Sequence, residues 1–281
     1  MTLFVNDLSH MDVSLYCTQQ GLMGASWHVD VELDGELGED GMLFDFGEVK
    51  PWIKARLDRG ADHTLLVPTE APGVTVTECT EGLCLHADHP YPLEVRGPRQ
   101  SFTLLPWKAI TAERLADQLS AELTRRPPPR VDDIRLSLRS EMIEGASYRY
   151  SHGLKHHRGN CQRIAHGHRS RLVIRLDGKR APALESHWAQ WLDGRYLIDE
   201  NDIVASEDGN AEERVTIRYH ASQGRFHLRL PQACCAILTT PTTIEHIAAW
   251  LATRIATAEG KRCRVQVFEG IGKGAIAESE S

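Results

Sequence analysis

One series of predicted elements occurs twice along this chain of 281 residues, and such a repeat strongly limits the folds that it can adopt. Each series begins with a short valine-threonine strand and continues through a glycine turn, an apolar run ending in proline, an amphipathic helix and a final strand. The first series covers residues 74–138 and the second covers residues 215–268. We therefore predict two units, residues 1–146 and 147–281, and interpret the proline run at 125–130 as a loop within the first unit.

The overall composition is that of a globular chain. Hydrophobic residues make up 41% and charged residues 25%, and the formal net charge of −7 predicts no nucleic-acid partner. The N-terminus lacks a signal-peptide pattern, and no apolar run is long enough to span a membrane. We therefore expect a cytoplasmic protein without a membrane partner, whose 7 cysteines are reduced thiols.

The periodicity of apolar residues predicts strands and helices in both units. Alternating patterns predict strands at 27–33, 134–138, 171–176 and 264–268, and helical periodicity predicts helices at 46–57, 111–125 and 243–256. Each unit then reads β-β-hairpin-α-β-β, with the helix at 46–57 as an addition in the first unit. We expect Asp45 to be the N-cap of that helix, and Thr242 with Glu245 to form a capping box at the last helix.

Histidines cluster in one segment of the second unit. Of the 14 histidines, five lie from His152 to His168, in a segment that also contains Cys161. In a β-strand residues i and i+2 project from the same face, so His166 and His168 can reach one point, and His152 can join them from a neighbouring strand. Three neutral imidazoles with an open fourth position are typical of a catalytic zinc site. The alternative is a polar loop with surface histidines.

Two further groups have the chemistry of a binding or catalytic site. In the first unit Asp62 precedes His63, and a carboxylate beside an imidazole raises its basicity and orients it for proton transfer near neutral pH. In the second unit Glu269 follows the strand at 264–268, where it could accept hydrogen bonds from the N–H and amino groups of a heterocycle. By itself, each of these features is weak evidence.

Together, the motifs resemble the 6-pyruvoyl-tetrahydropterin synthase and 6-carboxy-tetrahydropterin synthase family. The matching motifs are Cys161 before His-Gly-His at 166–168, Gly-Met-x-x-Asp-Phe at 41–46, Asp-His-x-x-Leu at 62–66, Pro-Thr-x-x-Glu at 241–245 and Val-x-Val-x-Glu at 265–269. The resemblance implies an α+β tandem tunnelling fold (T-fold), whose antiparallel sheets carry helices on one face and assemble into a barrel. It also implies Zn2+ as cofactor, a pterin triphosphate (7,8-dihydroneopterin triphosphate) as substrate, and a homo-oligomer.

The resemblance also implies roles for the candidate residues. These are zinc ligation by His152, His166 and His168, catalysis by Cys161, Asp62 and His63, and substrate binding by Glu269, Thr242 and Glu245. Family members are single-unit chains whose sites form between subunits, with the cysteine from one chain and the Asp-His pair from the next. Here the first unit has Met-Gly-Ala-Ser-Trp at 23–27 in place of His-Gly-His, and the second has Ala-Cys-Cys-Ala-Ile-Leu at 233–238 in place of Asp-His-x-x-Leu. We therefore expect each unit to supply half of one site.

Several alternatives stay open at this point. The activity is that of the carboxy-forming enzyme of the 7-deazapurine (queuosine) pathway, which we favour, or of the pyruvoyl-forming enzyme, or the chain is a degenerate member that binds a pterin or purine without turnover. Either Glu269 or Glu141 could anchor the ring. Candidate phosphate contacts are Lys155, Arg158, Arg163 and Arg169. The hairpins at 74–105 and 215–231 have no counterpart in the family pattern.

Overall fold

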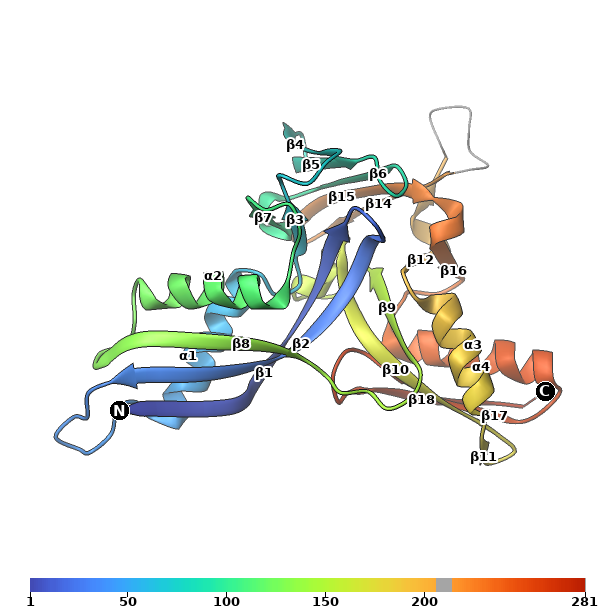
Figure 1. Cartoon of the computed structure of the whole chain (residues 1–281). Helices are drawn as coiled ribbons and strands as arrows, with labels where there is room; N and C mark the ends of the chain where they lie inside the picture. The colour runs from blue at the N-terminus through green and yellow to red at the C-terminus, as the bar shows by residue number, and fades with distance from the viewer. Residues whose placement is uncertain (206–213, 281) are drawn as a thin grey trace.

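The computed structural model describes residues 1–205 and 214–280, which form three β-sheets and four α-helices. Two of the sheets extend to opposite sides of the molecule with their helices, and the third lies above the region where they meet (Figure 1). The chain is therefore an α+β protein, as the sequence predicted. Among the described residues, none of the helices is long and apolar enough to cross a membrane.

The first sheet has the strand order β7-β3-β1-β2-β8 and belongs to the first half of the chain. The long hairpin β1-β2 is antiparallel, and β8 continues the sheet beside β2. Alternate residues of β2, such as Val29 and Val31, form one core with Val49 and Ile53 of α1. The elements are β1 Thr2–Cys17, β2 Gly21–Gly35, α1 Phe46–Arg59, β3 Leu65–Pro68, β7 Phe102–Leu105, α2 Ala112–Thr124 and β8 Val131–Ser140.

The second sheet has the order β16-β12-β9-β10-β17-β18, with β11 paired to β10, and belongs to the second half. Its core joins Leu172 and Ile174 of β10 to Leu251 and Ile255 of α4. The elements are β9 Ser147–His152, β10 His166–Leu176, β11 Lys179–Arg180, α3 Pro182–Leu192, β12 Arg195–Asp199, β16 Cys235–Leu238, α4 Ile244–Glu259, β17 Cys263–Phe268 and β18 Gly274–Ser279.

The third sheet, which we call the inserted sheet, is built jointly by hairpins from both halves. Its order is β13-β14-β15-β6-β5-β4, and the halves join where β15 pairs with β6 and Leu228 lies opposite Val95. The hairpins that the family pattern leaves out therefore link the two halves through backbone hydrogen bonds. The strands are β4 Val74–Cys79, β5 Gly82–Ala87, β6 Leu93–Gly97, β13 Ile203–Val204, β14 Arg214–Ala221 and β15 Gly224–Pro231.

The predicted strands lie within β2, β8, β10 and β17, and the predicted helices are α1, α2 and α4. The side chain of Asp45 accepts a hydrogen bond from the Gly47 backbone N–H, which confirms it as the N-cap of α1. The sequence analysis missed α3, whose buried face places Glu185 beside Ala189 and Leu192 and therefore has no continuous apolar stripe.

Two predicted details are wrong. The N-cap of α4 is Thr243, which accepts from the backbone N–H of His246, so Thr242 does not begin a capping box with Glu245. In the first half, β8 is the one strand between α2 and β9, and the predicted final β-β pair is therefore missing there. The chain passes from Ser140 to Ser147 without room for a further strand.

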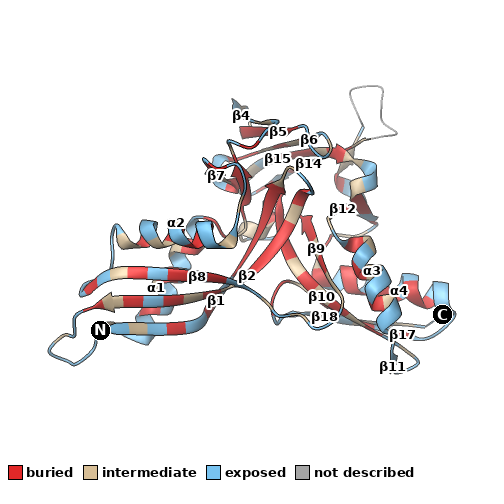
Figure 2. Cartoon of the chain, in the orientation of Figure 1, coloured by how far each residue is buried: buried red, intermediate tan, exposed pale blue. Residues whose placement is uncertain are grey.

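The hairpins β1-β2 and β9-β10 cross face to face at a pair of glycines. A Cβ added at Gly24 would lie 2.2 Å from the carbonyl oxygen of Tyr150, and one at Gly167 would lie 2.7 Å from the Cα of Gly24. Beside them, the Ser14 hydroxyl donates a hydrogen bond to Ser151 Oγ over 2.7 Å. Buried residues are concentrated on these strands where they cross (Figure 2). Glycine is required because any side chain would force the two backbones apart.

This crossing predicts that Gly24→Ala is strongly destabilising. The added methyl group overlaps backbone atoms of both β9 and β10, so we expect the free energy of unfolding to fall by roughly 3 kcal/mol. Urea denaturation followed by circular dichroism would measure the change. Gly47→Ala, at an exposed position in the first turn of α1, is the matched control and is expected to keep the wild-type midpoint or raise it slightly, because alanine favours a helix more than glycine does. Equal midpoints for both variants would contradict the proposed constraint.

Candidate metal centre and acid–base pair

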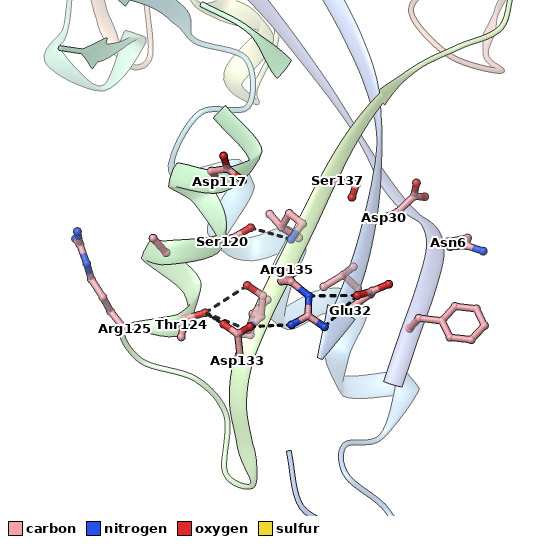
Figure 3. A pocket seen from close by; sticks show the side chains of 15 residues that line it. Asn6, Asp30, Glu32, Asp117, Ser120, Thr124, Arg125, Asp133, Arg135 and Ser137 are labelled. Carbon is pink, nitrogen blue, oxygen red and sulfur yellow. Dashed lines mark hydrogen bonds and ion pairs between the residues drawn. The ribbon is translucent and has the colours of Figure 1, made fainter. Parts of the chain in front are cut away.

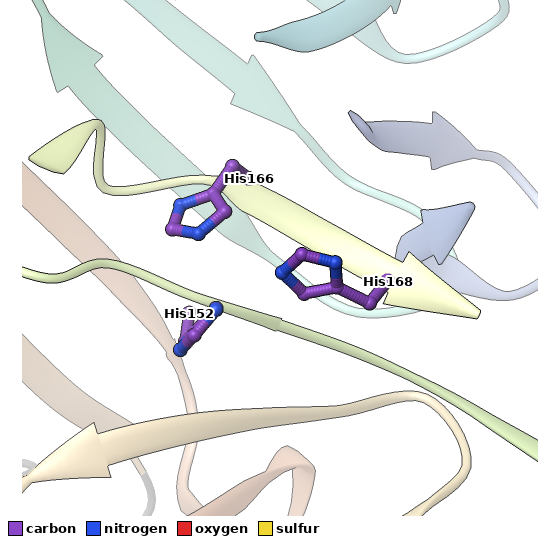
Figure 4. Close-up of side chains that lie close together, drawn as sticks. All are labelled: His152, His166 and His168. Atoms are coloured by element: carbon purple, nitrogen blue, oxygen red, sulfur yellow. The ribbon is translucent and has the colours of Figure 1, made fainter. Parts of the chain in front are cut away.

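Three histidines converge inside the second half of the chain. His166 of β10 lies directly opposite His152 of β9, and His168 follows two residues along the same face of β10. All three are at most 1% exposed, and one ring nitrogen from each lies within 4.8 Å of the others. Figure 4 shows the three rings facing a common point from the two strands. His166 and His168, two positions apart on one strand, thus meet His152 of the neighbouring strand, as the sequence predicted.

Each ring is oriented by a contact on its Nδ1 atom. His152 Nδ1 lies 2.9 Å from the carbonyl oxygen of Thr242, His166 Nδ1 lies 3.1 Å from that of Arg163, and His168 Nδ1 lies 3.2 Å from Asp12 Oδ1. A proton on each Nδ1 leaves the lone pair of each Nε2 free, and all three Nε2 atoms are buried without a hydrogen-bond partner. Three buried, unpartnered imidazole nitrogens held this way fit a zinc ion.

The environment keeps two of these imidazoles neutral. Burial is the main cause that lowers the pKa of His152 and His166 well below 6.5, and the neighbouring histidines lower it further. A metal ion binds the neutral form of imidazole. His152 and His166 are therefore already in the protonation state that ligation requires.

The sequence analysis did not identify Asp12, although it belongs to the site. It comes from β1 of the first half, is 4% exposed, and accepts a hydrogen bond from the Ser26 hydroxyl at Oδ1. Burial alone would raise its pKa, but the His168 and Ser26 contacts hold the pKa of this carboxyl well below its usual value. Asp12 is the one acidic residue in the apolar run of residues 11–17, which is the signal that could have revealed it.

Asp62 and His63 of the first half lie beside the histidine cluster. Asp62 Oδ2 is 2.7 Å from His63 Nδ1, and the rings of His63 and His166 are 5.4 Å apart. Burial by itself would lower the pKa of His63, but hydrogen bonds with Asp62 and Cys161 raise it to about 10. The structure therefore brings the Asp-His pair of one half within hydrogen-bonding reach of Cys161 in the other.

The equivalent position in the second half carries no histidine. Asp12 N–H donates to Asp62 Oδ1 over 2.9 Å, and correspondingly Arg149 N–H donates to Asp193 Oδ1 over 2.8 Å. The residue after Asp193 is Gly194. Its N–H donates to the Arg149 carbonyl, just as the N–H of His63 donates to the Asp12 carbonyl. The match to residues 233–238 in the sequence analysis is therefore wrong, because those residues correspond to the segment that contains β7.

The first half also lacks the three metal ligands. Judged from the strand registers, Leu15, Met23 and Ala25 occupy the positions of His152, His166 and His168. None of these apolar side chains is a typical zinc ligand. Of these two equivalent sets of positions, only the one in the second half therefore carries three histidines. A separate group of possible metal ligands, Cys84, His86 and Glu94, lies on β5 and β6 of the inserted sheet.

The remaining predicted residues lie at different distances from this centre. Thr242 is buried against His152, whereas Glu245 is exposed in the first turn of α4. The Glu269 carboxylate, 22% exposed, lies 3.6 Å from Lys273 Nζ, which is itself 3.9 Å from Asp12. Of the other candidates, Glu141 forms an ion pair with Arg171, and Lys155 forms one with Asp202. Arg163 donates a hydrogen bond to Gln223, and Arg169 donates one to the Glu141 carbonyl. The side chain of Arg158 is exposed.

A cavity of about 790 Å³ lies apart from this centre, along α2 and β8 (Figure 3). Three of its charged side chains pair with one another, since Arg135 lies 3.1 Å from Glu32 and 3.0 Å from Asp133. No histidine or cysteine lines it. We therefore assign the chemistry to the histidine centre rather than to this cavity.

Comparison with known proteins identifies one family. The sequence model of the family described as 6-pyruvoyl tetrahydropterin synthase matches twice, at residues 9–149 and 141–280. Proteins named "Putative 6-carboxy-5,6,7,8-tetrahydropterin synthase" from Pyrococcus horikoshii and Pyrococcus abyssi are 25% and 28% identical over 115 residues. These matches cover 41% of this chain and 66% of each relative, just under two thirds of its length. The crystal structure of 6-pyruvoyl tetrahydropterin synthase from Plasmodium vivax aligns with a TM-score of 0.37 and 18% identity, over 44% of this chain and 78% of that one.

The contact between Asp12 and His168 predicts that Asp12→Asn weakens zinc binding. The variant loses the carboxylate that orients the ring and increases the basicity of the ligand, so we expect the Kd for zinc to rise by about 10–100-fold. Competition with a chromogenic chelator would measure it, with one zinc per wild-type chain. Asp132→Asn changes an exposed aspartate and should leave the Kd unchanged. A wild-type Kd in Asp12→Asn would refute the role of Asp12.

The raised pKa of His63 predicts a pH-dependent contribution of Asp62 to stability. Because the folded-state value of about 10 exceeds the unfolded value near 6.5, the stabilisation is complete below pH 6.5 and disappears as the pH rises through 10. The difference in unfolding free energy between wild type and Asp62→Asn should therefore be largest near pH 6 and shrink towards pH 10. Urea denaturation across this range tests it. A difference that is constant with pH would show that His63 carries no extra proton.

Proposed function

Because the chain belongs to the 6-pyruvoyl tetrahydropterin synthase family, we propose that it is a zinc-dependent enzyme of the 6-carboxy-5,6,7,8-tetrahydropterin synthase type. Its substrate is 7,8-dihydroneopterin triphosphate, and each chain has one active site to which both halves contribute. The observation that carries this proposal is the meeting of Asp62 and His63 of one half with Cys161 and three buried histidines of the other.

His152, His166 and His168 would hold the metal through their free Nε2 atoms. Zinc, when bound there, lowers the pKa of a coordinated hydroxyl group, so that it can lose a proton at neutral pH. The contacts of Thr242, Arg163 and Asp12 fix the three rings before any ligand arrives. Asp12, as an anion beside His168, also offsets part of the positive charge brought in by the metal.

Cys161, His63 and Asp62 would move protons on the substrate side chain. Asp62 holds Nδ1 of His63, so the ring can exchange a proton with Cys161 on its other side. In this proposal the thiolate of Cys161 is the form that acts as a base. The three residues then work as one relay.

Glu269 is the proposed anchor of the pterin ring. Glu269 directly follows β17, and its carboxylate can accept paired hydrogen bonds from a ring N–H and the adjacent amino group. Lys273 lies between Glu269 and Asp12 and keeps positive charge beside both carboxylates. Glu141 is engaged with Arg171, so Glu269 is the better candidate of the two glutamates.

The names of the two Pyrococcus relatives favour the carboxy-forming reaction over the pyruvoyl-forming one. The two outcomes differ in carbon balance. The substrate side chain has three carbons, so a carboxyl product retains one and releases a two-carbon fragment, whereas a pyruvoyl product retains all three. Product analysis by mass spectrometry therefore distinguishes them.

Assembly into a homo-oligomer is part of the same proposal. In the described residues, β8 and β18 each pair on one edge, which leaves the other edge open. Open strand edges are usually covered or paired, because they otherwise promote aggregation. Pairing between chains along these edges would extend the sheets towards a closed barrel.

The proposed relay predicts that Cys161→Ala and His63→Ala each lower kcat by at least about 100-fold. Release of triphosphate from 7,8-dihydroneopterin triphosphate is the measurement, and zinc content should stay at the wild-type level. Cys79→Ala and His187→Ala remove the same groups away from the centre and should retain full activity. Wild-type protein that releases no triphosphate, or active Cys161→Ala and His63→Ala variants, would refute the proposed function.

A further inference from the structure

The loop that carries Cys161 is held by the inserted sheet. This loop, residues 153–165, connects β9 to β10, and the turn between β14 and β15 lies against it. The Tyr219 hydroxyl of β14 donates to the Gln162 carbonyl over 2.8 Å, and the Ser222 hydroxyl donates to Gln162 Oε1 over 3.0 Å. The contact is therefore made by the hairpin that has no counterpart in the family pattern.

Gln162 is the buried centre of this contact. It is 0% exposed, and its Oε1 accepts from the backbone N–H of Gln223 over 2.7 Å as well as from Ser222. Its Nε2 donates to the carbonyls of Gly159 and His157 within the loop. Since a buried amide left without partners is costly, this full set of bonds holds the residue next to Cys161 in one place.

The Gln223 side chain binds residues on both sides of Cys161. Its Nε2 donates to Asn160 Oδ1 over 2.9 Å, and its Oε1 accepts from Arg163 Nε over 3.0 Å. Asn160 and Arg163 flank the segment that contains Cys161. The Gln223 side chain therefore fixes both ends of the short segment that contains Cys161.

The same two loop residues also bind the first half of the chain. Asn160 Nδ2 donates to the Asp58 carbonyl at the end of α1, and Arg163 donates to the carbonyls of Asp62 and His63. Gln223 thus orients the two side chains, Asn160 and Arg163, that connect the Cys161 loop to the end of α1 and to the backbone of the Asp-His pair. A shift of Asn160 or Arg163 would change the separation between Cys161 and His63.

We propose that Gln223 is a positioning residue, through which the inserted β14-β15 hairpin aligns Cys161 with His63. The inference rests on the proposed function for the role of the thiol. Gln223 acts through Asn160 and Arg163 and touches neither the metal ligands nor the reacting atoms.

Kinetics of Gln223 variants test the alignment. Gln223→Ala should lower kcat by about tenfold with KM within a factor of two, because misplacement of a catalytic group affects the reaction more than binding. Zinc content should not change. Gln223→Glu retains the acceptor for Arg163 and should recover part of the loss, whereas Gln223→Lys places a cation beside Arg163 and should not. Gln100→Ala, at an exposed site bordering the inserted sheet, is the control.

A double variant separates alignment from general stability. In a Cys161→Ala background there is no thiol to align, so adding Gln223→Ala should not lower the residual rate further. Hydrogen exchange of the backbone amides at residues 158–164 supplies a readout without substrate, and it should become at least about tenfold faster in Gln223→Ala. Unchanged exchange, or an equal loss of kcat in both backgrounds, would overturn the proposal. An inactive wild type with faster exchange in Gln223→Ala would instead refute the proposed function and retain the clamp on the loop.

Discussion

The close approach of Gly24 and Gly167 is the contact on which the rest of the structure depends. Because neither residue has a side chain, the hairpins of the two halves can cross with their backbones in contact. That crossing brings Asp12 of the first half to His168 and places His63 next to His166. The candidate site therefore exists only where the two halves meet, although its three candidate metal ligands all belong to one of them.

The two halves use the same framework for different purposes. In one, the backbone contacts of Asp12 and Asp62 hold a histidine against the metal centre; in the other, the equivalent contacts involve Arg149 and Asp193. Arg149 also forms an ion pair with Asp193 and a hydrogen bond with Gln20. One half thus carries the candidate site, and the equivalent position of the other half carries a structural ion pair.

Much of the candidate site was predictable because its motifs are local. The spacing of His166 and His168 determines a shared face in any strand, and Asp62-His63 is a contiguous pair. Asp12 and Gln223 were missed, since neither belongs to a motif and each acts on a residue more than fifty positions away; for Asp12 the one sequence signal is its place as the acidic residue in an apolar run. Similarly, α3 was missed because Glu185 interrupts its apolar face and is buried by pairing with Arg180.

The sequence by itself determined the class of fold, the histidine cluster and the division of the motifs between two units. Periodicity and spacing report local geometry, and these features depend on little else. Only the tertiary structure decided that the two parts meet in one place, that the three histidines have no counterpart at the equivalent positions of the first half, and that both hairpins form one inserted sheet. Those outcomes depend on which backbones can approach each other, and here that was decided by two glycines and by strand edges that pair across the halves.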